Sequence, residues 1–352
     1  MIVQLVVFSS VVLGLCWFIA RRKPKLLRRM FKPGSPLFAL GYQFYSKTRL
    51  GHYYHAKNLK KARDQFPDGH SVVEVTEMNG IKIRPIPYLE DNYAYLVIDK
   101  ATNMAVVIDP GDPEVVQYWI EQEGVSITAI LTTHKHWDHS GGNTSLRKVY
   151  KKLAVYGSST DSVPGLTHHV VDQESIQVGG LRFTALFTPG HTVGHMAYLL
   201  HSPGGDSPDC VFTGDLLFLG GCGRMFEGPA SLMLQSLDKI CELSQDTIVW
   251  PGHEYARDNL DFAQNLEPGN QEVMAKFSWV KERRKERLIT APSSVSEERS
   301  YNPFLRASSS SLVQALRKDE GSDHGLDVDK EENRASILKE LRNRKDKYFY
   351  KL

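Results

Sequence analysis

Three histidines and an aspartate fall within six residues, directly after an apolar run that is typical of a buried strand. The run is Ile127–Leu131, and residues 133–139 then read Thr-His-Lys-His-Trp-Asp-His. Neutral imidazoles and carboxylates are the usual ligands of zinc and of iron or manganese. So dense a cluster is costly unless its lone pairs are used, and an irregular loop allows two metals to lie close together. The feature predicts a metal site at the end of a strand.

Three further apolar runs end in the same way. They are residues 181–187 before His191, 210–212 before Asp215, and 247–250 before His253. Each candidate ligand stands close to a glycine, which lets the backbone approach a crowded centre, and open α/β sheets generally place their sites at strand ends. A lone histidine is more often a core or surface residue than a ligand. Four such junctions in this order predict one shared metal centre rather than a chance cluster.

The centre of the chain predicts an α/β fold. Residues 95–99 and 104–109 have the composition of strands, and a Pro-Gly-Asp-Pro turn follows them. Residues 114–123 then place Val116 and Ile120 on one helical face, and Gly124 supplies a stop. Strands that alternate with helices are typical of α/β domains.

The N-terminal residues predict a membrane anchor. Residues 1–20 contain no charged side chain and have the length that a bilayer requires. Basic residues follow between 21 and 32 without an acidic one, which differs from a cleaved signal peptide and places the rest of the chain on the cytosolic side. A cleaved signal and a mitochondrial targeting segment are the alternatives. Residues 21–80 are a basic, aromatic juxtamembrane segment, which could lie along an anionic membrane or pack as a helical collar on the main domain.

The remainder divides into two predicted domains. Residues 81–254 carry the four junctions, and residues 255–352 form a helical domain. The helices expected there are 256–266, 271–286 and a basic one at about 335–347. Residues 308–332 are Ser-rich and then acidic, which predicts a flexible loop.

Composition adds little to this picture. A formal net charge of +2, without a recognition motif, gives no indication of nucleic-acid binding. The four cysteines are too few and too scattered for a disulfide framework, which favours a reducing compartment. No feature predicts a protein partner.

The whole pattern resembles the metallo-β-lactamase superfamily. His-x-His-x-Asp-His, followed by a distant His, an Asp and another His, is the motif of that superfamily. Further runs resemble its glyoxalase II (hydroxyacylglutathione hydrolase) branch, namely residues 91–93, 188–195, 212–215, 221–224, 251–255 and 301–304. The resemblance extends from about residue 81 to the C-terminus. It implies an αββα metallo-β-lactamase sandwich with a C-terminal helical domain that binds substrate.

The resemblance also implies two divalent metal ions per chain. In the family pattern His134, His136 and His191 hold one ion, Asp138, His139 and His253 hold the second, and Asp215 bridges both. Every position has the expected residue. Zinc is the first choice, with iron or manganese as alternatives. His195 lies outside this set and is expected to be a structural histidine that bonds nearby backbone.

Substrate contacts are carried over in the same way. Tyr255, Arg342 and Lys345 match family contacts with glutathione, although the last two could equally belong to a solvated helix face. Arg224 replaces a lysine, which keeps the charge but changes the donor geometry. Phe226 replaces a tyrosine and deletes one hydroxyl, at a cost on the order of 1 kcal/mol. A glutathione thioester is the expected substrate, with relaxed or altered specificity as the alternative.

The implied reaction converts an S-2-hydroxyacylglutathione to glutathione and a 2-hydroxy acid, with Asp138 and Asp215 as catalytic residues. Two bridged cations would lower the pKa of a shared water from about 15.7 toward 7, and the hydroxide, oriented by Asp138, would attack the acyl carbon. A thiolate with a pKa of about 8.5 leaves without a general acid. No Gly-x-Ser-x-Gly elbow occurs in the domain, which disfavours serine catalysis.

Two other classes of function remain open. A persulfide dioxygenase relative uses one iron, but the complete second ligand set and the long helical C-terminus argue against it. A membrane-tethered scaffold with weak activity is the other, because ligands can be kept for the stability that metal binding adds to a fold. Counting metals and assaying hydrolysis would separate the three.

Overall fold

The computed structural model describes residues 41–42, 45–46, 48–205, 207–317 and 330–349. The chain divides into two units, Met1–Tyr54 and His55–Leu352, and both β-sheets belong to the second. The predicted membrane span of residues 1–20 lies outside the described residues, as do residues 21–40 of the predicted juxtamembrane segment.

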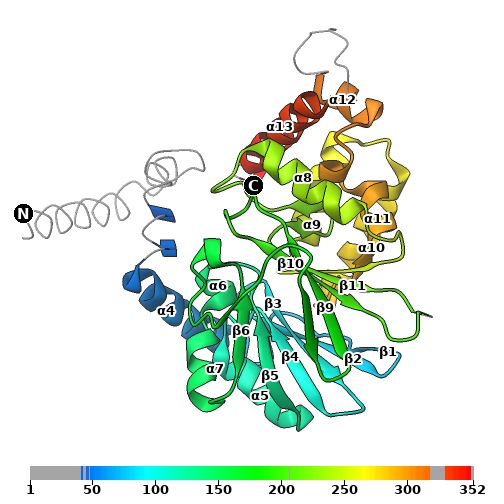
Figure 1. Cartoon of the computed structure of the whole chain (residues 1–352). Helices are drawn as coiled ribbons and strands as arrows, with labels where there is room; N and C mark the ends of the chain where they lie inside the picture. Colours follow the sequence, from blue (N-terminus) through cyan, green and yellow to red (C-terminus); the bar gives the residue numbers. More distant parts are fainter. Residues whose placement is uncertain (1–40, 43–44, 47, 206, 318–329, 350–352) are drawn as a thin grey trace, which may run out of the picture. The chain divides into compact units, whose positions relative to one another are not determined.

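Two mixed β-sheets form the framework of the second unit (Figure 1). The first contains, in spatial order, β1 (Thr76–Met78), β2 (Ile81–Tyr88), β3 (Asn92–Asp99), β4 (Met104–Ile108), β5 (Ser126–Leu131), β6 (Ala154–Gly157) and β7 (His168–His169). The second contains β15 (Ser293–Ser294), β14 (Ile248–Pro251), β11 (Cys210–Gly214), β10 (Met196–His201), β9 (Leu181–Phe187) and β8 (Ser175–Val178). A two-stranded ribbon is formed by β12 (Leu217–Phe218) and β13 (Gly221–Cys222). Strands β4 to β7 run parallel, and β11 is parallel to β14.

Side-chain alternation along β3 shows how the first sheet is packed on both faces. Tyr95 and Val97 belong to the core between the two sheets, together with Phe212 of the second sheet. The intervening Leu96 and Ile98 belong to a second core on the opposite face. Because successive side chains of a strand point to opposite faces, a strand that is apolar at every position needs cover on both sides.

Helices supply that cover on the outer face of each sheet. Apolar residues of α5 (Pro113–Glu123) and α7 (Asn143–Val149) pack against the first sheet. The outer face of the second sheet packs against α8 (Ala230–Cys241), α11 (Val295–Tyr301) and α13 (Glu331–Phe349). The other helical elements are α4 (Arg49–Gln65), α6 (Trp137–Ser140), η1 (Ser159–Asp161), α9 (Ala256–Leu266), α10 (Gln271–Lys285), η2 (Pro303–Leu305) and α12 (Ser310–Arg317). The last helices gather together beyond the sheets in Figure 1. The predicted α/β sandwich with a helical C-terminal region is confirmed.

The prediction of a flexible loop over residues 308–332 is wrong for its first part. Residues 310–317 form α12, in which Leu312, Val313 and Leu316 are buried in the core under the second sheet. Their spacing places three apolar side chains on one helical face. The prediction relied on the high serine content of this stretch and did not take that spacing into account. Residues 318–329 lie outside the described part of the chain.

Candidate metal centre

The seven predicted ligands follow four different strands and meet in one cluster. His134 and His136 lie in the loop after β5, and Asp138 and His139 lie in α6, which continues that loop. The remaining three ligands, His191, Asp215 and His253, follow β9, β11 and β14. All are buried except Asp138, which is half-buried. The fold therefore brings together every residue that the sequence assigned to metal binding.

The first group consists of three buried imidazoles. Nδ1 of His136 lies 2.9 Å from Nε2 of His134 and 3.1 Å from Nε2 of His191. The rings of His136 and His191 are inclined at 82°. Their inner nitrogens therefore point to one position from different directions, as in a site with three protein ligands and an open coordination position.

The second group lies on the other side of Asp215. Nε2 of His139 and Nε2 of His253 are 3.2 Å apart, and each lies 3.7 Å from Oδ2 of Asp138. Oδ1 of Asp215 is 3.2 Å from the Nε2 atoms of both histidines, while its Oδ2 is 3.3 Å from Nε2 of His191. One carboxylate thus faces both groups with different oxygens.

Hydrogen bonds on the outside of the cluster fix the direction of the imidazole lone pairs. Three histidines place Nδ1 against an oxygen that can only accept: His191 against the carbonyl of Arg224 (2.9 Å), His139 against Asp109 (2.9 Å) and His253 against Asp91 (2.8 Å). Nδ1 therefore carries the proton, and in the neutral ring Nε2 presents a lone pair to the centre.

This arrangement fits divalent cations. Three Nε2 lone pairs converge on the carboxylate of Asp215, whose buried Oδ1 has no hydrogen-bond partner among the described residues. Ring nitrogens that converge on a buried carboxylate are unfavourable unless a cation, either a metal ion or a proton, lies between them. Outer hydrogen bonds from ligating histidines to carboxylates and carbonyls are the usual support of such a site.

The electrostatics differ between the two groups. Burial lowers the pKa of His134 and His136 well below the usual value for histidine. Burial also acts to lower the pKa of His253, but the carboxylates of Asp215 and Asp91 outweigh it and raise the pKa to about 10. Burial acts to raise the pKa of Asp138, but the facing histidines lower it to about 2. Without a cation the second group therefore holds a proton at neutral pH, and binding of a cation would release it.

Asp109 supports the centre, and the sequence analysis did not assign it that role. It accepts hydrogen bonds from the backbone and hydroxyl of Thr133 as well as from His139. Its φ of 50° lies in the left-handed region, which is costly for a non-glycine residue and is often found at functional sites. Asp109 directly follows β4, so it occupies the same position after a strand as the ligands do. That position was the signal that could have identified it.

His195 has the structural role expected of it. Its Nε2 accepts a hydrogen bond from the backbone N–H of Asp215 at 3.2 Å, and its Nδ1 lies 3.0 Å from the hydroxyl of Thr188. Burial lowers its pKa to about 3, so the ring is neutral. Its contact with the backbone helps to hold Asp215 between the two groups.

Gly252 leaves the space that the cluster needs. A methyl group at this position would lie 2.8 Å from Oδ1 of Asp215 and 2.9 Å from Cε1 of His139. We expect Gly252→Ala to reduce bound metal to about half or less of the wild-type content, as for a displaced metal ligand. Elemental analysis of the purified protein measures this. Gly269→Ala is the matched control, because a methyl there would meet nothing within 4 Å. Full metal content in Gly252→Ala would contradict the crowding that we describe.

Phe226 and Tyr255, two of the predicted substrate residues, flank the two groups. The ring centroid of Phe226 lies 5.2 Å from that of His191. Tyr255 stacks on His253 at 4.7 Å with an interplanar angle of 10°. Each group therefore has one aromatic neighbour from the predicted substrate set.

Two of the three basic residues of that set pair with Asp346. Nε of Arg224 lies 3.2 Å and a terminal nitrogen of Arg342 lies 2.9 Å from its carboxylate, and Arg342 also donates to the carbonyl of Cys222. Lys345 donates to the carbonyl of Asp258, and burial, together with Arg342, lowers its pKa to about 7. Arg342 and Lys345 are only 8% and 4% exposed, so the alternative of a solvated helix face is wrong.

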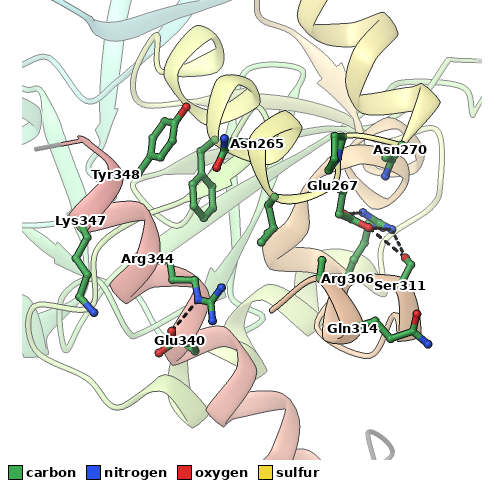
Figure 2. Close-up of a pocket in the computed structure, with 15 residues that line it drawn as sticks. Asn265, Glu267, Asn270, Arg306, Ser311, Gln314, Glu340, Arg344, Lys347 and Tyr348 are labelled. Carbon is green, nitrogen blue, oxygen red and sulfur yellow. Dashed lines mark hydrogen bonds and ion pairs between the residues drawn. The ribbon is translucent and has the colours of Figure 1, made fainter. Parts of the chain in front are cut away.

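A cavity of about 1080 Å³ lies elsewhere in the helical region, between α9, α12 and α13 (Figure 2). Its charged lining residues largely neutralise one another, as Arg306 with Glu267 and Arg344 with Glu340. None of the predicted metal or substrate residues lines it. We therefore look to the histidine cluster for the chemistry of the chain.

Comparison with known proteins agrees with this geometry. Residues 88–253 match the family model "Metallo-beta-lactamase superfamily", and residues 254–348 match "Hydroxyacylglutathione hydrolase C-terminus". Over 270 residues the chain is 40% identical to the Arabidopsis thaliana protein "Hydroxyacylglutathione hydrolase cytoplasmic", covering 76% of this chain and 99% of that protein. The chain belongs to the hydroxyacylglutathione hydrolase family. The predicted resemblance is confirmed, and as a member of that family the chain is a metal-dependent hydrolase.

Solved structures similar to this hydroxyacylglutathione hydrolase family member include two bacterial proteins. ETHE1 from Myxococcus xanthus is 29% identical, with a TM-score of 0.47, and the match covers 70% of this chain and 94% of that one. A metallo-beta-lactamase from Staphylococcus aureus is 22% identical, with a TM-score of 0.49, and the match covers 75% and 72% of the two chains.

The predicted membrane location, with its mitochondrial alternative, is wrong. The Arabidopsis relative is named as a cytoplasmic protein. Among the helices that the structure describes, none combines the length and the apolar character needed to cross a bilayer. The prediction rested on residues 1–20, which lie outside those described, and on apolar length, which is necessary for a span but does not establish one.

Proposed function

We propose that this chain hydrolyses thioesters of glutathione, releasing glutathione and a 2-hydroxy acid, with two divalent metal ions in the cluster. His134, His136 and His191 would hold the first ion, Asp138, His139 and His253 would hold the second, and Asp215 would contribute to both. The observation that carries the proposal is the position of Asp215, whose two oxygens lie 3.2 Å and 3.3 Å from nitrogens of different groups. The printed name of the 40% identical relative supports the substrate class.

Zinc is the metal that we propose first. The donors are imidazoles and carboxylates, and no thiolate is among them. Such a set suits zinc, and it also suits iron or manganese. Direct metal analysis of the purified chain decides between them.

The chemistry needs few protein groups. A pair of divalent cations lowers the pKa of water and polarises an acyl carbonyl. Asp138 is half-buried and ionised. Its Oδ2 faces His139 and His253, so its Oδ1 can accept a hydrogen bond from the attacking water and orient that water toward the acyl carbon. Water adds to that carbon and the carbon–sulfur bond breaks. One proton of the water ends on the departing sulfur, and the other is released as the product acid ionises. A thiolate with a pKa of about 8.5 leaves without a dedicated acid.

The basic residues near the centre supply a site for the carboxylates of glutathione. Among the described residues, Arg224 and Arg342 share the single carboxylate of Asp346, so this group of three side chains keeps a net positive charge. The backbone carbonyl of Arg224 also bonds to His191, which connects this basic cluster with the first metal group. Tyr255 stacks on His253, so its ring would contact the substrate on the side of the second metal group.

Phe226 gives a test of substrate recognition that leaves the metal ligands intact. We expect Phe226→Tyr to lower the KM for a glutathione thioester several-fold, because one additional hydrogen bond contributes about 1 kcal/mol. The turnover number should change little, since the ring keeps its place beside His191. Steady-state kinetics with S-D-lactoylglutathione measures both. An unchanged or raised KM would show that the missing hydroxyl does not limit binding.

The proposal itself is tested with the full-length chain. We expect about two metal ions per chain and hydrolysis of S-D-lactoylglutathione at roughly 1–1000 per second. Removal of metal with a chelator should abolish the activity, and added zinc should restore it. Two ions with negligible turnover would favour the scaffold alternative, and one iron with oxygen uptake would favour a dioxygenase.

A further inference from the structure

Two buried histidines precede the part of the chain that the family models match. His55 lies in α4 and His70 follows that helix, whereas the matched residues begin at 88. Both therefore lie outside the residues that the family models match, 88–253 and 254–348. They are only 2% and 3% exposed, although the helix that carries His55 is highly polar.

The ring of His55 lies between two segments that lead to the second metal group. Its Nε2 donates to the carbonyl of Gly111 at 3.1 Å. It also packs directly on Gly141, where a methyl group would come within 2.7 Å of Nε2. Gly141 ends α6, which carries Asp138 and His139. Gly111 follows Asp109, the carboxylate that accepts from His139. His55 therefore contacts Gly111, two residues after Asp109, and Gly141, the residue that ends α6.

The ring of His70 fixes a second turn behind the same metal group. Its Nε2 donates to the carbonyl of Asn92 at 2.9 Å, and its Nδ1 accepts from the hydroxyl of Ser71 at 2.8 Å. The side-chain amide of Asn92 lies 3.3 Å from Oδ2 of Asp138. The neighbouring Asp91 accepts from Nδ1 of His253 at 2.8 Å. The turn at residues 91–92 thus supports two ligands of the second group, Asp138 and His253, and His70 holds that turn through the carbonyl of Asn92.

We propose that His55 and His70 are positioning residues for the second metal ion, so that residues 55–70, which precede the matched family domains, contribute to the metal centre. Each fixes a turn whose carboxylate orients a histidine ligand, Asp109 for His139 and Asp91 for His253. The inference rests on the proposed function, because it takes Asp138, His139 and His253 as ligands. His191, by contrast, is oriented by the carbonyl of Arg224, so the first ion should depend far less on these contacts.

The size of the effect follows from the distance of each histidine from the metal. Groups that bond directly to metal ligands typically change metal affinity about 10- to 100-fold when removed. His55 and His70 act one contact further out, so we expect a loss of about three- to tenfold for the second ion. Loss of the backbone hydrogen bond, rather than of charge, is the cause, because burial lowers the pKa of His70 to about 4 and its ring is neutral.

Full-length variants test the proposal by metal titration. The variants are His55→Asn, His70→Asn, His55→Gln and His70→Gln, with His169→Gln, which changes an exposed histidine of β7, as the control. The amide of glutamine reaches the position of Nε2 and can donate, while that of asparagine is too short. Chelator competition with zinc gives both dissociation constants, and the visible spectrum of the cobalt-loaded chain reports the geometry of each site.

We expect the asparagine variants to raise the dissociation constant of the second ion about three- to tenfold and to leave that of the first ion within about twofold. The cobalt spectrum should change only in the contribution of the second site. The glutamine variants should recover most of the affinity. If the asparagine variants bind the second ion as the wild type does, or if glutamine gives the same loss as asparagine, the inference is overturned while the proposed function stands. A wild-type chain without a second ion would overturn both.

Discussion

Replacement of Asp215 with asparagine is expected to reduce kcat/KM for S-D-lactoylglutathione by about three orders of magnitude, a change of about 4 kcal/mol in transition-state free energy. Asp215 faces both groups, with oxygens 3.2 Å from His139 and 3.3 Å from His191. Asparagine keeps the shape of the side chain but lacks the charge, and one of its two terminal atoms becomes a donor that repels a cation. The loss of catalysis should therefore accompany a loss of metal.

Two measurements on the same preparation separate these effects. Elemental analysis should show that bound metal falls from about two ions to about one or fewer, and steady-state kinetics should show the loss of kcat/KM. Asp246→Asn makes the same chemical change at an exposed carboxylate that bonds to Ser244, and it should leave both quantities unchanged. If Asp215→Asn kept two ions and most of its activity, the bridging role of Asp215 would be refuted.

The candidate ligands could be found from the sequence because they follow a repeated local rule. Each comes shortly after an apolar strand, and in a layered α/β fold such loops lie close together. The central strands and helices were predictable for the same reason, since their periodicity is local. Residues 181–187 and 256–266 form β9 and α9 with the predicted bounds. Metal ligation itself remains a prediction, although the distances between the ligand atoms support it.

Contacts between segments that are distant in sequence could not be predicted in this way. Asp109 bonds to His139 thirty residues later, and Arg224 supports His191 through its backbone carbonyl, which no side-chain pattern reveals. His55 and Gly111 are separated by 56 residues. Such pairs depend on the tertiary fold, so a sequence identifies the ligands of a site more readily than the groups that orient them.

Asp161 is the clearest case of a support that the sequence did not indicate. It is completely buried in η1 and accepts from the backbone N–H of Lys135 at 2.7 Å, the hydroxyl of Thr192 at 2.9 Å and the N–H of Gly194 at 3.2 Å. The ammonium of Lys135 lies 3.3 Å away and also pairs with Glu227 at 2.6 Å. One carboxylate therefore joins the loop that carries His134 and His136 to the loop that carries His191.

We expect Asp161→Ala to lower the free energy of unfolding by about 3–5 kcal/mol. The substitution leaves two buried N–H groups without acceptors, and it removes one of the two carboxylates that pair with the buried ammonium of Lys135. Urea denaturation of the chelator-treated protein measures this without the contribution of bound metal. Asp161→Asn keeps an acceptor oxygen and should lose less, while Thr160→Ala, at an exposed neighbour in η1, should stay within about 0.5 kcal/mol of the wild type. The two ligand loops lose their common support in Asp161→Ala, so the first ion should also bind more weakly in whatever fraction folds. A normal unfolding midpoint together with normal binding of the first ion would show that the two loops hold their positions without Asp161.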